Sequence, residues 1–129
     1  MYQDEKCLYQ STYAELHIEH LYTVEINATF SVFVKSYGFT GEYNFCMQKE
    51  QMMNTISNLK ELYDSLFGSC RLIDADSDSH ICIEFENKNL KISGQLGGSY
   101  EDNFMKFSFL ADQTLIKLLM NTLSVALNN

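Results

Sequence analysis

Residues 22–34 read YTVEINATFSVFV, and nearly every second side chain in this stretch is apolar. A two-residue period sends successive side chains to opposite faces of an extended chain, which is typical of a half-buried strand. We therefore expect one long antiparallel strand here, or two strands joined at a bend. Upstream, residues 15–19 show the same alternation, and downstream residues 43–47 resume it after a predicted turn at 36–38.

The spacing of apolar side chains changes to that of a helix between residues 52 and 66. The apolar side chains recur every three or four positions and are Met52, Ile56, Leu59, Tyr63 and Leu66. This stripe predicts an amphipathic helix. Gly68 follows the last apolar turn and is predicted to end the helix in a left-handed conformation.

Strands return after this helix, and a second helix follows them. Short apolar stretches at 70–73, 81–85, 90–96 and 105–109 are separated by polar loops at 74–79 and 97–103 and by a turn at 87–89. Asp112 is predicted to cap a C-terminal helix. That helix directs inward Leu115, Ile116, Leu119, Leu123 and Ala126. The order strands, helix, strands, helix predicts an α+β fold, with a mainly antiparallel sheet of about six to eight strands covered on one face by two helices.

Length and composition indicate one domain, residues 1–129, that is large enough to enclose a core. Seventeen acidic residues against nine basic ones give a net charge of −8, so we expect no direct contact with nucleic acid. No secretory signal and no membrane-spanning stretch is recognised, which predicts a cytoplasmic protein without a membrane partner. Cys7, Cys46, Cys70 and Cys82 form no C-x-x-C pair and are predicted to be free thiols.

Signatures of catalysis are weak in this chain, so we expect neither an enzyme nor a cofactor. His17 and His20 are three positions apart, which places them on opposite faces of a strand. Alternating acids at 74–78 resemble the start of a calcium loop, but the required Gly and the bidentate Glu are missing. The alternative is a small-ligand-binding domain or an enzyme that uses His80 and the acidic residues near it.

Acidic side chains concentrate in two parts of the sequence. The first set comprises Asp74, Asp76, Asp78, Glu84 and Glu86, and the second patch comprises Tyr100, Glu101 and Asp102. A merely hydrated face is the commoner fate of such charges. The functional alternative is an epitope that attracts a basic partner and accelerates its association.

Several landmarks between residues 39 and 127 resemble the WapI-type immunity proteins. The stretches that carry the resemblance are Phe39-Thr40-Gly41, Leu59 to Tyr63, Leu66-Phe67-Gly68, Leu90 to Leu96 and Phe107 to Thr114. The most particular of them is Asp112-Gln113-Thr114, which follows an aromatic strand.

This resemblance implies a function for the chain. WapI-type immunity proteins are small bacterial proteins encoded beside the toxic C-terminal domains of polymorphic and contact-dependent growth inhibition toxins. A member would bind its cognate toxin domain in the cytoplasm and block it without catalysis. Such toxins are often nucleases with basic substrate channels, including tRNA-cleaving ones. The acidic residues named above are therefore the expected toxin-binding residues.

Overall fold

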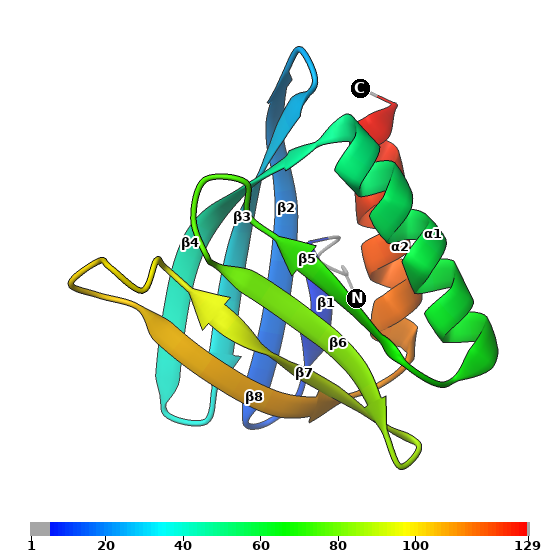
Figure 1. The fold of residues 1–129 in the computed structure, drawn as a ribbon. Coiled ribbons are helices and arrows are strands. Elements are labelled where there is room, and N and C mark those ends of the chain that lie inside the picture. The colour runs from blue at the N-terminus through cyan, green and yellow to red at the C-terminus, as the bar shows by residue number, and fades with distance from the viewer. Residues whose placement is uncertain (1–5, 129) are drawn as a thin grey trace, which may run out of the picture.

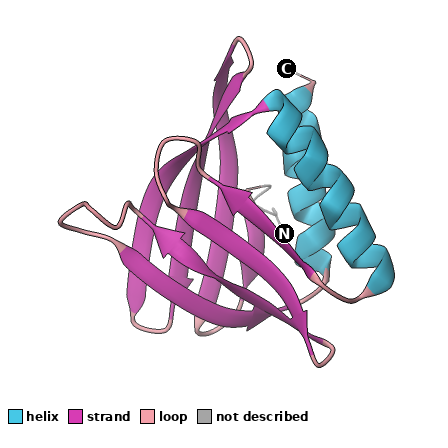
Figure 2. Cartoon of the chain, viewed as in Figure 1, coloured by secondary structure: helices cyan, strands magenta, loops and turns pink. Residues whose placement is uncertain are grey.

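The computed structural model describes residues 6–128, which form eight strands and two helices. The strands make two antiparallel four-stranded sheets (Figures 1 and 2). The first sheet contains β1 (Cys7–Gln10), β2 (Ala14–Val24), β3 (Asn27–Ser36) and β4 (Phe39–Gln48), and the second contains β5 (Ser69–Ile73), β6 (His80–Glu86), β7 (Asn89–Leu96) and β8 (Met105–Ala111). Helix α1 (Lys49–Ser65) follows the first sheet and α2 (Thr114–Leu127) follows the second. The predicted α+β class and the order of elements are confirmed.

The strands are divided between two sheets, and the helices lie together beside them (Figure 1). Helix α1 packs against α2, β4 and β5, whereas α2 packs against β1 and β2. The buried apolar side chains of both sheets and both helices form one cluster. Helix α1 therefore packs against both sheets, whereas α2 packs against the first, and the expectation that both helices cover one face of a single sheet is wrong. The reason is that α1 separates β4 from β5 and interrupts the hydrogen-bond ladder.

The stretch at 22–34 folds as two strands joined by a tight turn. Val24 lies opposite Asn27, and Glu25 takes a left-handed conformation with φ 56° between them. The tip of this hairpin projects beyond the rest of the first sheet (Figure 1). The predicted turn at 36–38 is confirmed and joins β3 to β4, whereas β1 was not predicted.

Helix α1 differs from the prediction in its end and in its buried face. The left-handed residue that ends it is Leu66, with φ 57°, whose N–H donates to the Leu62 carbonyl, so the prediction for Gly68 is wrong. The buried residues of α1 are Met52, Thr55, Leu59 and Leu62. Ile56 is only partly buried, because the contacts with α2 and β5 turn the inward face away from the simple apolar stripe.

Helix α2 agrees with the prediction. All five expected inward side chains are buried. The N-cap residue of α2 is Gln113, whose side chain makes no capping bond. The preceding Asp112 supplies the predicted contact instead, because its Oδ1 accepts hydrogen bonds from the Thr114 N–H and hydroxyl, each at 3.0 Å. These bonds lower the pKa of the Asp112 carboxyl. All four cysteines are free thiols, and no helix within residues 6–128 is long and apolar enough to cross a membrane.

Candidate functional site

Asp74, the first of the predicted acidic residues, lies inside the protein. Its side chain is buried, with 3% relative exposure. Its Oδ1 accepts the Cys46 N–H at 2.8 Å and its Oδ2 accepts the Ser77 hydroxyl at 2.6 Å. The Ala75 N–H also donates to the Cys46 carbonyl at 2.9 Å, so the β5–β6 loop is fastened to β4. Asp74 is thus a structural residue, and the prediction that it belongs to an exposed binding face is wrong.

Asp78, at the other end of this loop, connects it to the loop between β7 and β8. Its carboxylate accepts the Ser99 N–H at 2.9 Å and also the Ser99 hydroxyl. These hydrogen bonds lower the pKa of Asp78. Gln95 supports the same junction from a buried position and donates to the Gly97 carbonyl at 2.9 Å. The two polar loops therefore form one connected structure.

The β7–β8 loop is also bound to the first sheet. The Tyr43 hydroxyl on β4 donates to Glu101 Oε1 at 2.9 Å, and this bond raises the pKa of Tyr43. Gly97 has φ 90°, and a Cβ there would meet the Asn103 carbonyl at 3.0 Å, so the loop needs glycine at this position. Both loops consequently lie beside β4 (Figure 1).

Together the two loops present an exposed acidic area that we call the loop surface. It consists of Asp76, Asp78, Tyr100, Glu101 and Asp102, all of which are exposed. Tyr100 is fully exposed, at 103% of its reference area. From the sequence, residues 74–78 and 100–102 were expected to belong to separate patches. In the structure the contact between Asp78 and Ser99 joins them.

Glu84 and Glu86 lie apart from the loop surface. Both are exposed, as predicted from the alternation along β6. The strand leads away from the β5–β6 loop, and the six steps between consecutive residues from His80 to Glu86 span about 20 Å at the usual rise per residue. Glu86 lies 3.7 Å from Lys91, which partly neutralises it. The structure does not bring these two carboxylates together with those of the loops.

His80 stands at the junction of the loop and β6, and its contact is with the backbone. Its Nδ1 lies 3.0 Å from the Asp78 carbonyl oxygen, while the Asp78 carboxylate is occupied by Ser99. The Ser99 hydroxyl bonds directly to the Asp78 carboxylate. In a catalytic triad an imidazole lies between these two groups and activates the serine, and His80 does not occupy that position. Among residues 6–128, no three or more His, Cys, Asp or Glu side chains are arranged to hold a metal ion.

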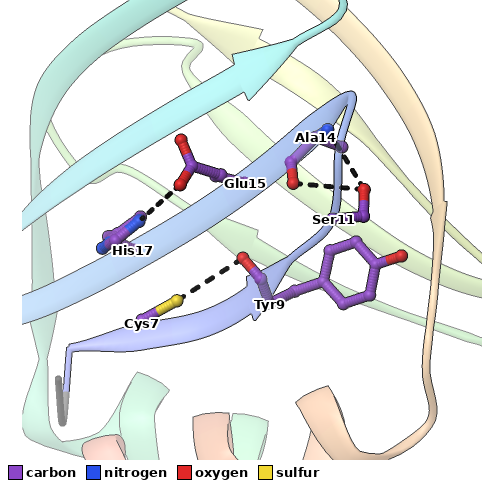
Figure 3. Close-up of polar contacts among 6 residues, drawn as sticks. All are labelled: Cys7, Tyr9, Ser11, Ala14, Glu15 and His17. Carbon is purple, nitrogen blue, oxygen red and sulfur yellow. Dashed lines mark hydrogen bonds and ion pairs between the residues drawn. The ribbon is translucent and has the colours of Figure 1, made fainter. Parts of the chain in front are cut away.

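A hollow on the outer face of the first sheet was not predicted. It has a volume of about 390 Å³ and is lined by Lys6, Glu15, His17, Glu19, Ser31, Phe33 and Glu42. Figure 3 shows Glu15 and His17 side by side on β2, where His17 Nε2 lies 3.9 Å from Glu15 Oε1. His20 instead contacts Phe30 of the core, so the two histidines do occupy opposite faces. The alternation of polar side chains at 15–19 was visible in the sequence. The residues of β3 and β4 that lie next to them in the sheet could not be predicted from it.

Comparisons of the chain with protein-family models, with curated proteins and with solved structures find no match. The resemblance to the WapI-type immunity proteins stays a prediction that rests on the residues quoted for it. The geometry of the loop surface is the basis for the functional proposal that follows.

Proposed function

We propose that this protein is an immunity protein that binds and neutralises a cognate bacterial toxin domain in the cytoplasm. The proposed binding site is the loop surface, and the proposed partner is a basic nuclease domain of the class that includes tRNA-cleaving toxins. The observation that carries the proposal is the hydrogen bonding between Asp78 and Ser99, which joins two acidic loops into one exposed area. The protein blocks the toxin by occupying its surface and performs no reaction.

The chemistry of the loop surface suits a basic protein partner. Carboxylates of Asp76 and Asp102 are exposed and available to Arg or Lys side chains. Tyr100 offers a rigid aromatic side chain of the kind that anchors many interfaces. The net charge of −8 attracts a basic domain over long distances and accelerates its association.

The Asp78–Ser99 junction also reduces the entropic cost of binding. A loop that is already ordered loses less conformational freedom when a partner binds to it. Here the loops are tied to each other and to β4 by Asp74, Asp78 and Glu101. The exposed carboxylates of Asp76 and Asp102 are therefore presented from a pre-organised base.

The experiment is co-expression with the toxin domain encoded by the neighbouring gene, scored by growth, together with calorimetric measurement of affinity at two salt concentrations. We predict that the double variant Asp76→Lys/Asp102→Lys loses growth rescue, binds the toxin at least about tenfold more weakly, and shows a reduced salt dependence. Affinity is expected to fall because each substitution replaces the attraction between a carboxylate and the basic partner with a repulsion.

The matched control is Glu84→Lys/Glu86→Lys, which changes the net charge by the same amount at the far end of β6. It is expected to keep growth rescue and nearly all of the affinity. If both double variants weaken binding equally, the loop surface is not the specific site. If wild-type protein neither binds nor rescues, the immunity function itself is wrong.

A further inference from the structure

The hollow on the first sheet is built from three neighbouring strands whose side chains share one face. His17 on β2 lies opposite Phe33 on β3, and Phe33 lies opposite Glu42 on β4. Glu19 and Ser31 form the next row along the sheet. The buried side chains of these strands point to the opposite face of the sheet. The side chains that line the hollow therefore face outward.

Two side chains at the centre of the hollow are enclosed, whereas Lys6 and Glu19 at its rim keep 48% and 49% of their side-chain exposure. Glu15 and His17 keep only 21% and 22% of their side-chain exposure. The rings of His17 and Phe33 form a T-shaped pair with a centroid distance of 5.5 Å and an interplanar angle of 80°. The Ser31 hydroxyl donates to Glu42 Oε1 at 3.1 Å. The result is a depression with an aromatic wall and oriented carboxylates.

The charges around the hollow favour a cation of particular shape. Glu15, Glu19 and Glu42 supply three carboxylates, and the Lys6 ammonium, 3.6 Å from Glu19, offsets one of them. Lys35 on β3 lies opposite Glu15 at the border of the hollow and offsets a second, so the carboxylates outnumber the ammonium groups by one. A guanidinium group is planar, donates in two directions to carboxylates and stacks against aromatic rings. The remaining negative charge favours a cation over a phosphate or carboxylate ligand. The lining therefore matches an arginine side chain better than an anion.

The hollow and the loop surface both adjoin the edge strand β4. Glu42 and Cys46 occupy the same side of β4, four residues or about 13 Å apart. Cys46 adjoins the β5–β6 loop, because its N–H donates to Asp74 Oδ1 at 2.8 Å and its carbonyl oxygen accepts the Ala75 N–H at 2.9 Å. A specific interface usually covers about 800 Å² and 20–30 residues on each partner. The five residues of the loop surface supply only part of that area.

We propose that the hollow is a second contact site for the same partner and that it binds an arginine side chain of that partner. The identity of the partner rests on the proposed immunity function, whereas the affinity of the hollow for a guanidinium group can be measured without any toxin. One partner lying across β4 would then contact the acidic loops on one side and place its arginine beside Phe33 on the other.

The test uses acetyl-arginine amide as the probe and acetyl-citrulline amide as an uncharged control of the same shape. Nuclear magnetic resonance of the full chain should show saturable shifts of the His17 and Phe33 side-chain signals with the arginine probe only. Glu15→Gln/Glu42→Gln should weaken this binding about two- to fivefold, the scale of partly exposed ion pairs. The control Glu84→Gln/Glu86→Gln should leave it unchanged.

Equal shifts with both probes, or unchanged affinity in Glu15→Gln/Glu42→Gln, would overturn the proposed arginine site and leave the immunity function standing. The same double variant should also weaken toxin binding. If it binds the arginine probe poorly but the toxin normally, the hollow is not a contact site for that partner. Failure of wild-type protein to bind the toxin, with arginine binding intact, would remove the proposed partner instead.

Discussion

Asp74 shows how one buried carboxylate can order a loop that carries exposed ones. It bonds to the Cys46 N–H and to the Ser77 hydroxyl, and it is almost entirely shielded from water. We predict that Asp74→Ala lowers the free energy of unfolding by about 1–3 kcal/mol, because the Cys46 N–H and the Ser77 hydroxyl lose their common acceptor. Urea denaturation followed by circular dichroism measures this change. Asp76→Ala, an exposed neighbour, is the control and should change stability by less than about 0.5 kcal/mol. Equal losses in the two variants would contradict the anchoring role of Asp74.

At the scale of elements, the beginning of α2 depends on the charge state of Asp112. Its carboxylate accepts two hydrogen bonds from Thr114, and these lower its pKa in the folded protein. Because the pKa of Asp112 is lower in the folded than in the unfolded protein, its carboxylate stabilises the fold at pH values above the ordinary carboxyl pKa of about 3.9. This stabilisation is lost as the pH falls through the pKa of the folded protein. Asp112→Ala should therefore lower the melting temperature at about pH 7, and the difference from wild type should shrink near about pH 3. Thermal melts at both pH values test this, and a difference that grows on acidification would contradict the cap.

Elements were predictable where local spacing determines them. Alternation at 22–34 and the helical period in α2 depend on side chains a few positions apart, and both gave the correct element type. Which face of α1 is buried depends on its contacts with α2 and β5, so Ile56 was expected inside and is only partly buried. The four-residue strand β1 is too short for a periodic signal.

Contacts that build the candidate site join residues far apart in the chain, which sequence periodicity does not encode. Asp74 and Cys46 are 28 positions apart, and Asp78 and Ser99 are 21 apart. The sequence therefore predicted the two acidic segments as loops. It did not predict that Asp74 is buried or that the two loops contact each other. The rows of the hollow likewise need the register of three strands, of which only the β2 residues Glu15, His17 and Glu19 formed a visible pattern.

At the scale of the whole molecule, we predict that the helices make the two sheets unfold as a single cooperative unit. Because α1 packs on β4 and β5 while α2 packs on β1 and β2, loosening the helix pair removes support from both sheets. Leu59 is fully buried in this shared core, and Leu59→Ala should lower the free energy of unfolding by about 2–5 kcal/mol. Ile56→Ala, on the partly buried side of α1, should lower it less. Hydrogen exchange of the central strands β3 and β7 distinguishes cooperative from separate unfolding, since cooperative unfolding lowers the opening free energy of their slowest amides equally. If Leu59→Ala exposes β7 while β3 keeps its protection, the two sheets unfold independently and the core is not one unit.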